Sequence, residues 1–175
     1  PQRLAEIDEG HYQISWPHAG KVGTAFNYHP AGKGLNHRTN LYYAETADGG
    51  MTWAAVDGTP LQTPLRTVDN PARVHDYEAA GSLVYMKDLN YDAEGRPVIL
   101  YLTARSWRPG EAGGPHTWHT ARWTGERWER RAVTTSDHNY DMGSLYITPD
   151  TWTILAPTDP GPQPFGAGGE VVRWT

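Results

Sequence analysis

Short stretches of hydrophobic and polar residues recur along this chain, separated by turns rich in glycine and proline. The stretches are enriched in β-branched and aromatic residues, which is the composition of β-strands. No window keeps helical periodicity for long between the glycine and proline residues. The pattern predicts an all-β fold with strands at residues 11–16, 21–29, 39–46, 52–56, 82–91, 97–103, 117–123, 128–134, 143–148, 152–157 and 170–174.

One motif indicates how these strands are grouped. Residues 46–53 read T-A-D-G-G-M-T-W, which matches the Asp-box pattern (Ser/Thr-x-Asp-x-Gly-x-Thr-Trp) of β-propeller repeats. In this pattern Asp48 accepts hydrogen bonds from its own turn, Gly50 takes a positive φ, and Trp53 fills the gap between neighbouring sheets. A plain Asp-Gly-Gly hairpin between two strands is the alternative reading.

In a propeller blade the Asp box lies between the third and fourth strands. Its position in the chain therefore shows which strand of a blade each predicted strand is. It predicts a propeller fragment of about three four-stranded antiparallel blades, at approximately residues 10–57, 81–135 and 142–175. We expect one partial domain over residues 1–175, with 52–56 as the fourth strand of the first blade. Closed propellers have about four to eight blades, so we expect further blades from a longer chain, or self-association. A β-sandwich is the alternative fold.

This assignment of strands to blades also places the long loops together. The connections between second and third strands and those between blades lie on one face of a blade, and the tight turns lie on the other. Long irregular loops on a rigid scaffold are where function usually resides. The predicted loops are residues 27–38, 57–81, 104–116, 135–142 and 158–169.

Composition excludes several classes of partner. The net charge is −5, and no run of lysine or arginine occurs, so nucleic acid and anionic membranes are poor partners. There is no cysteine, which excludes disulfides and thiolate sites. The chain shows no signal peptide and no apolar span. No ligand spacing supports a metal site; we assign no metal ligands and no required cofactor, and leave calcium or zinc binding open.

The first predicted loop carries the candidate catalytic residues. Tyr28 and His29 end one strand, and His37 and Arg38 open the next, so hairpin geometry brings the two pairs together. Arginine can hold both oxygens of a uronate carboxylate, and tyrosine or histidine can transfer a proton. The alternative is that His29 begins a turn and that Tyr28 and Arg38 only pack on each other.

Five further residues are candidates for substrate binding. His138 and Tyr140 precede the innermost strand of the third blade, near the expected central channel, although this segment could also be a capped turn. Trp107 could stack on a sugar ring, as could Trp118 and Tyr77, but most tryptophans here are expected in the core. The predicted substrate-binding set is Asn27, Asn40, Trp107, His138 and Tyr140.

Several of these segments together resemble one family. The strings G-T-A-F-N-Y-H-P (23–30), R-T-N-L-Y-Y-A-E-T-A-D-G-G-M-T-W (38–53), L-V-Y-M-K-D-L-N-Y-D-A-E-G-R-P-V-I-L-Y (83–101), H-N-Y-D-M-G-S-L-Y-I (138–147) and G-P-Q-P-F-G-A-G-G-E (161–170) resemble BNR-repeat proteins that include ulvan-lyase-like polysaccharide lyases. The resemblance implies a seven-bladed parent that is secreted or periplasmic. It also implies an anionic polysaccharide or oligosaccharide substrate, whose uronate-containing chains are cleaved by β-elimination.

The resemblance also implies roles for individual residues. Tyr28 looks like the catalytic tyrosine, and Arg38 looks like the arginine that neutralises the uronate carboxylate. The catalytic histidines of the family lie in an earlier blade, so His29 and His37 are candidates by proximity alone.

Two other functions remain open. A sialidase-like hydrolase would need three arginines around a carboxylate, and the loops offer Arg38, Arg73, Arg105 and Arg108 without a clear set. A non-catalytic glycan-binding propeller would use the aromatic loops only for stacking. Fold alone does not choose among the three.

Overall fold

The computed structural model describes residues 2–108, 112–158 and 170–175. These residues form eleven β-strands and no α-helix, in three antiparallel sheets of four, four and three strands, so the predicted all-β propeller fragment is confirmed. The strands are β1 (Gln13–His18), β2 (Lys21–Tyr28), β3 (Thr39–Thr46), β4 (Arg73–His75), β5 (Leu83–Tyr91), β6 (Pro97–Ala104), β7 (His116–Trp123), β8 (Trp128–Ser136), β9 (Ser144–Ile147), β10 (Trp152–Pro157) and β11 (Val171–Trp174).

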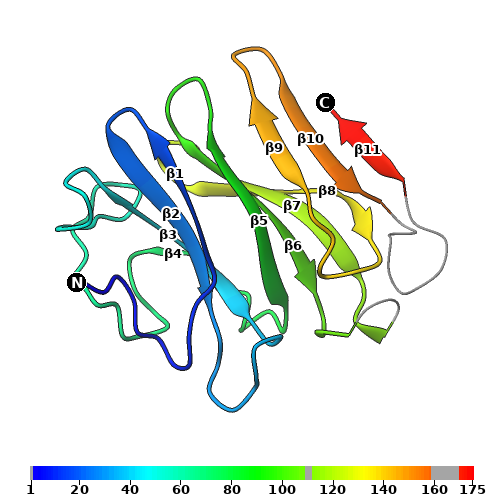
Figure 1. The fold of residues 1–175 in the computed structure, drawn as a ribbon, viewed down its shortest axis with the longest axis horizontal. Coiled ribbons are helices and arrows are strands. Elements are labelled where there is room, and N and C mark those ends of the chain that lie inside the picture. The colour runs from blue at the N-terminus through cyan, green and yellow to red at the C-terminus, as the bar shows by residue number, and fades with distance from the viewer. Residues whose placement is uncertain (1, 109–111, 159–169) are drawn as a thin grey trace.

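Each sheet is a meander whose strands follow chain order. The first strands of the three sheets, β1, β5 and β9, are neighbours in space. Figure 1 shows the tight turns β1–β2, β5–β6 and β9–β10 at the upper end of the sheets, and the connections that follow β2 and β8 at the lower end. The connections after β2 and β8 therefore lie together as predicted, on the face that we call the loop face. The predicted loop 57–81 is divided by β4, and its residues 57–72 belong to the connection between β3 and β4 and lie beside Trp53. Of the predicted loop 158–169, residues 159–169 lie outside the described ranges.

The sheets are held together by side chains that fill the space between them. Successive side chains of a strand point to opposite faces, and β6 is covered on both. Ile99 and Tyr101 pack toward the first sheet, in a cluster with Leu41. Leu100 packs in a second cluster with Leu145 of the third sheet. This double coverage explains the nearly continuous apolar run of β6.

One predicted strand is wrong. Residues 52–56 were expected to complete the first sheet, but only Ala54 bridges to β3, at Glu45, and the fourth strand is β4. The cause is a tight reversal at Asp57 and Gly58. Gly58 has φ +86° and its N–H donates to Ala55 O at 2.9 Å, so the chain folds back before it can follow β3 further. The first sheet therefore extends to His75 and not to residue 57.

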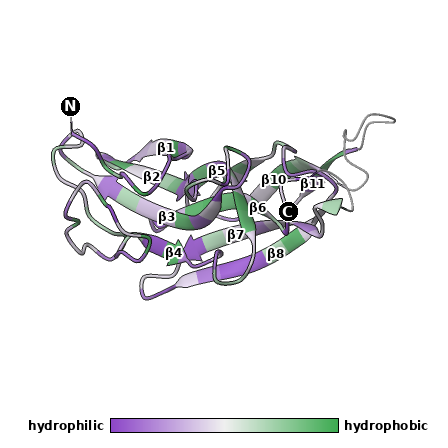
Figure 2. Ribbon diagram, turned by 90° about the horizontal axis from the view of Figure 1, so that it is seen from below, coloured by the Kyte–Doolittle hydropathy of each residue, from purple (hydrophilic) through white to green (hydrophobic). Residues whose placement is uncertain are grey.

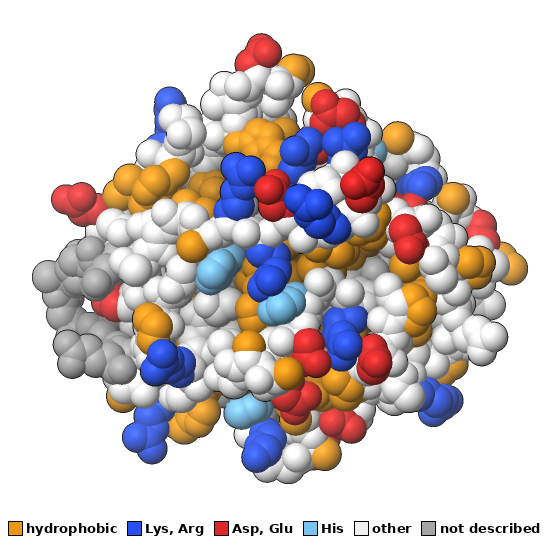
Figure 3. Space-filling view, turned by 180° about the vertical axis from the view of Figure 1, so that it is seen from behind, with side chains coloured by type: hydrophobic (Ala, Val, Ile, Leu, Met, Phe, Trp, Pro, Cys, Tyr) orange, Lys and Arg blue, Asp and Glu red, His pale blue; other side chains and the backbone are white. Residues whose placement is uncertain are grey.

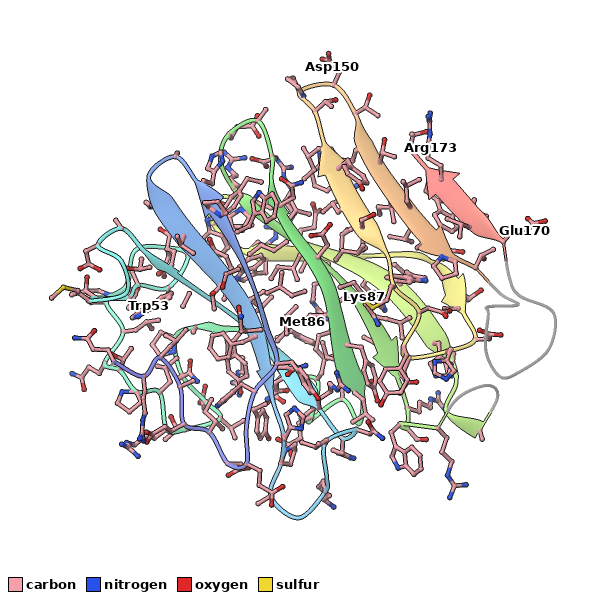
Figure 4. All side chains as sticks on the ribbon, viewed as in Figure 1. Trp53, Met86, Lys87, Asp150, Glu170 and Arg173 are labelled. Carbon is pink, nitrogen blue, oxygen red and sulfur yellow. The ribbon has the colours of Figure 1, made fainter. Side chains whose placement is uncertain are left out.

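The turn at residues 46–53 has the hydrogen bonds expected from its sequence. Asp48 Oδ1 accepts from Thr52 N at 2.9 Å and from Thr46 Oγ1 at 2.8 Å, and Gly50 has φ +90°. These bonds, the one from the Thr52 backbone first, lower the pKa of Asp48 to about 2. Trp53, labelled in Figure 4, packs against a cluster that includes Phe26 on the outer side of the first sheet. The turn lies away from the loop face and has a structural role.

The outer side of the fragment is polar. In Figure 2 the outer strand β8 is mostly hydrophilic, and four of its nine residues are exposed while one is buried. Glu129 and Arg131 form an exposed ion pair there at 3.2 Å. Acidic and basic side chains are mixed on the view from behind in Figure 3. No helix in the described part of the chain has the length and hydropathy needed to cross a membrane.

The packing of β6 leads to a stability prediction. Ile99→Ala should lower the free energy of unfolding by about 2–5 kcal/mol, because it leaves a cavity between two sheets. Val22→Ala is the control, since Val22 is 37% exposed and such changes cost less than about 0.5 kcal/mol. Urea denaturation measures both, and equal losses would contradict the assignment of Ile99 to the inter-sheet core.

Candidate functional site

The loop face holds an arginine surrounded by aromatic rings. The Arg38 guanidinium carbon lies 4.2 Å from the ring centre of Tyr12, 4.9 Å from that of Tyr85 and 5.7 Å from that of Tyr140. We call these three residues the tyrosine cage. Aromatic faces attract a cation without neutralising it. Arg38 forms no ion pair with a carboxylate within the described ranges, and its buried Nε has no hydrogen-bond partner there.

Hydrogen bonds fix this arrangement across all three sheets. The Tyr85 hydroxyl donates to Asn36 O at 2.9 Å, and the Tyr140 hydroxyl donates to the side-chain oxygen of the same residue. Val84 N on β5 donates to Arg38 O at 2.9 Å. The loop that carries Arg38 is therefore fastened to the second sheet and to the segment before β9.

Tyr28 pairs with Thr39, the residue after Arg38, and has an acidic partner. It is 1% exposed at the end of β2, and its hydroxyl donates to the Glu78 carboxylate. Burial, and then this hydrogen bond, raise the pKa of Tyr28 well above its usual value. The phenol is therefore protonated at neutral pH. Asn40 holds Glu78 in place, since its Oδ1 accepts from Glu78 N at 2.8 Å.

Three histidines of the loop face are neutral at pH 7. Burial is the main cause that lowers the pKa of each, with Arg38 adding to it at His29 and Lys33 at His37. At His138 burial outweighs two nearby aspartates. His138 Nδ1 accepts from Tyr140 N at 2.9 Å, so its proton lies on Nε2. Neutral imidazole can accept a proton, which a charged one cannot.

A buried lysine completes the set of polar groups. Lys87 on β5 is 9% exposed, and its Nζ donates to Asn139 O at 2.8 Å. It lies 6.0 Å from the ring centre of Tyr85. Burial, reinforced by the charge of Arg38, lowers the pKa of Lys87 to about 7.

The structure groups the predicted catalytic residues in two adjoining sets. Arg38 and His29 both contact Tyr12, with the His29 and Tyr12 ring centres 5.0 Å apart. The charge of Glu78 acts on the pKa of both Tyr28 and His37. Of the predicted substrate-binding residues, Tyr140 belongs to the tyrosine cage and His138 lies next to it.

The two predicted asparagines have structural contacts instead. Asn27 is fully buried; its Nδ2 donates to Val84 O at 3.0 Å and its Oδ1 accepts from Tyr12 N at 3.2 Å. Asn40 is also fully buried, with its amide engaged by Glu78 and Tyr42. Both amides are occupied by the protein, so we no longer place them on a substrate.

The aromatic residues considered for stacking differ in exposure. Trp107 is 47% exposed, and its carbonyl accepts from Asn139 Nδ2 at 2.9 Å, which ties it to the segment before β9. Trp118 and Tyr77 are buried in the inter-sheet clusters and are unavailable to a sugar.

Sequence reasoning missed Tyr12, Glu78, Tyr85 and Lys87. The assignment of strands to blades could have indicated Tyr85 and Lys87, because it places β5 beside the loop that carries Arg38. Glu78 lies in a predicted loop, but nothing in its spacing pairs it with Tyr28. No group of three or more metal-ligating side chains occurs within the described residues.

A hollow of about 440 Å³ lies elsewhere, between the second and third sheets, and includes Arg122, Trp152 and Trp174 in its lining. Both arginines of its lining have carboxylate partners. Arg122 pairs with Asp92 at 2.7 Å and with Glu94 at 3.2 Å, and Arg131 pairs with Glu129 at 3.2 Å. We place the candidate site on the loop face, where Arg38 and Lys87 form no ion pair with any carboxylate that the structure describes.

Comparison with known families identifies the chain. A family model described as "BNR repeat-containing family member" matches residues 4–136. The chain belongs to the BNR repeat-containing family. The matched residues span the first and second sheets of this BNR-repeat chain, including Tyr28, Arg38 and Lys87. No curated protein matches it at a significant level.

Solved structures show the same fold. Two similar ones are described as a new family of polysaccharide lyase, PL25 ulvan lyase, one of them bound to -[GlcA(1-4)Rha3S]-. The TM-scores are 0.66 and 0.65 at 17% sequence identity. The match covers 85% of this chain and 36% of each neighbour, so the BNR-repeat chain spans about a third of their length.

Asn40 provides a test of how the site is built. It has φ +58° at an irregularity in β3, a left-handed conformation that costs most residues about 1–2 kcal/mol and that asparagine tolerates better than alanine. Asn40→Ala should lower the free energy of unfolding by about 1–3 kcal/mol, through this strain and the lost bond to Glu78 N. Asn40→Gly should cost less, because glycine removes the strain. Urea denaturation measures both; equal stability of the alanine variant and the native protein would contradict this role.

Proposed function

We propose that this chain forms part of a polysaccharide lyase that acts on uronate-containing chains by β-elimination. The observation that carries the proposal is Arg38, a cation held by the tyrosine cage without a carboxylate partner in the described ranges. Such a guanidinium is ready to bind both oxygens of a carboxylate. The Tyr28–Glu78 pair belongs to the same strand ends, because Tyr28 on β2 pairs with Thr39, the residue after Arg38. The neighbour bound to a glucuronate-containing saccharide supports the same class of ligand.

The chemistry follows from these positions. A uronate carboxylate bound by Arg38 loses its repulsion toward a developing negative charge, so the proton on C5 becomes more acidic. A base removes that proton, the C4–O bond breaks, a C4–C5 double bond forms, and the leaving oxygen receives a proton. Tyr28 is the donor of that proton, because its raised pKa keeps it a phenol.

The base is a neutral histidine. Among the described residues, His37 is the stronger candidate, because the charge of Glu78, the partner of Tyr28, acts on it. The activity belongs to the intact protein, since this chain corresponds to about a third of the similar lyases. A secreted or periplasmic location is part of the same proposal, because such polymers lie outside the cell.

The two rival functions are less well supported. A sialidase-like site needs several free arginines, and Arg73 is paired with Asp69 at 2.9 Å and Asp76 at 3.2 Å. A non-catalytic glycan-binding propeller would need the tyrosine cage but not the Tyr28–Glu78 pair. Product analysis separates the three functions.

The intact protein, incubated with glucuronate-containing polysaccharide, should release unsaturated uronate that absorbs in the ultraviolet. A hydrolase releases reducing ends without this chromophore, and a binding module releases neither. Either of those outcomes contradicts the lyase proposal.

Variants test the assigned roles. Arg38→Ala should lower kcat/KM by about 10²–10³ through lost charge stabilisation, and Tyr28→Phe should lower it by about 10²–10⁴ through lost proton donation. Arg38→Lys should remain well below the native enzyme, because lysine lacks the forked geometry. Arg131→Ala, on the outer side, is the control and should retain activity. Full activity of Tyr28→Phe or Arg38→Ala with folding intact would overturn these roles.

A further inference from the structure

Lys87 occupies an unusual backbone position. In the pairing of β5 with β6, Met86 pairs with Tyr101 and Asp88 pairs with Leu100, so Lys87 is an extra residue on β5. A bulge of this kind re-aims the side chain that it carries, and bulges are frequent beside functional sites. Figure 4 shows Met86 and Lys87 on opposite sides of β5, with Lys87 toward the third sheet.

The bulge places an amine where its charge is costly. A buried cation is destabilising unless a charge compensates it. Lys87 forms no ion pair with a carboxylate in the part of the chain that the structure describes. Its hydrogen-bond acceptor is a neutral carbonyl, that of Asn139.

The charged and titratable groups around it come from three elements. Arg38, from the loop after β2, disfavours the charged amine, and Asp141, from the segment before β9, favours it. His138 in that segment also interacts with Lys87, and Tyr85 on β5 presents its ring. The carboxylate of Asp141 accepts a hydrogen bond from Ser136 and forms no ion pair with Lys87 among the described residues, although its charge favours the charged amine.

Arg38 also has a polar atom without a partner. Its buried Nε has no hydrogen-bond partner among the described residues. Arg38 and Lys87 both lie within 6.0 Å of the Tyr85 ring centre. Unsatisfied buried polar groups are rare in folded proteins and call for an explanation. A bound oxyanion would supply acceptors for both cations.

We propose that Lys87 and Arg38 form a two-cation subsite for an oxyanion of the bound saccharide, and that Lys87 takes up a proton when this anion binds. This inference rests on the proposed function, because it assumes that an anionic saccharide occupies the loop face. The oxyanion is a carboxylate or a sulfate ester, and the ligands below distinguish the two.

The ligand-free protein gives a first test. Between pH 7 and about 10 the unfolded chain keeps the Lys87 proton, while the folded chain loses it near pH 7. The unfolded state then binds more protons, so stability rises with pH in this window. The urea midpoint of the native protein should therefore rise relative to that of Lys87→Met from pH 7 to 10. Parallel midpoints would mean that the amine is already charged, and would overturn the proposal.

Proton uptake gives the second test. The measurement is titration calorimetry of the intact protein with the Tyr28→Phe substitution, which suppresses cleavage. The ligand is an oligosaccharide of alternating glucuronate and 3-sulfated rhamnose, and the titration is repeated in buffers with different ionisation enthalpies. We expect uptake of about one proton per ligand at pH 8. The affinity should fall up to about fiftyfold from pH 7 to 9, as the charged fraction of Lys87 falls.

Variants in the same background assign that proton. Lys87→Met should lose the uptake and bind more weakly, whereas Lys87→Arg should lose the uptake but bind with an affinity that changes little with pH. Lys21→Met is the matched control and should behave as the parent, because Lys21 is 53% exposed and pairs with Glu45 at the opposite end of the sheets. Uptake that disappears with carboxyl-reduced ligand assigns the uronate carboxylate to the subsite, as the role of Arg38 in the lyase proposal requires. Uptake that disappears with desulfated ligand assigns a sulfate and overturns that role of Arg38.

The outcomes separate this inference from the proposed function. If the saccharide binds and Arg38→Ala weakens it, but uptake is absent or persists in Lys87→Met, the two-cation subsite is wrong and the lyase proposal stands. If the saccharide does not bind, both are wrong. Normal binding and uptake in Lys87→Met, with only kcat reduced, would also overturn the subsite, because Lys87 would then act in proton transfer.

Discussion

The site depends on one seam between two sheets, at the backbone of Val84 on β5. Its N–H donates to Arg38 O and its carbonyl accepts from Asn27 Nδ2, so β5 is fixed against the end of the first sheet. This seam sets Arg38 beside Tyr85 and, two residues further along β5, beside Lys87. The apolar clusters on either side of β6 keep the sheets at the spacing that the seam requires. Packing between blades therefore determines the electrostatics of the loop face.

The sequence predicted most of the strands because both faces of a propeller sheet are buried. Strands such as β6 then appear as unbroken apolar runs, and one motif at residues 46–53 was enough to set their order. The fourth strand of the first sheet was missed because a tight reversal at Gly58 ends the run at 52–56, whereas β4 is only three residues long. Short edge strands carry too little pattern to be recognised without the pairing partner.

The candidate site was predictable only in part, for a similar reason. Arg38 and Tyr28 stood out because their residue types suit carboxylate binding and proton transfer. Their partners did not, since Glu78 and Lys87 become partners only through the contacts between sheets. Asn27 shows the opposite error: a polar residue next to a catalytic candidate has its amide fully engaged by backbone groups. Residue type indicates chemistry, but the hydrogen-bond inventory decides whether that chemistry is available.

In the proposed elimination, environment also assigns the direction of proton transfer. Tyrosine and histidine can each serve as acid or base, and their order in the sequence does not choose between them. Burial and the Glu78 carboxylate hold the Tyr28 proton in place, while burial keeps His29 and His37 uncharged. The protonated phenol is a proton donor and the neutral imidazole is a proton acceptor, and both are present in the same resting protein. Elimination needs this combination, because one proton leaves the substrate and another enters it in the same cycle.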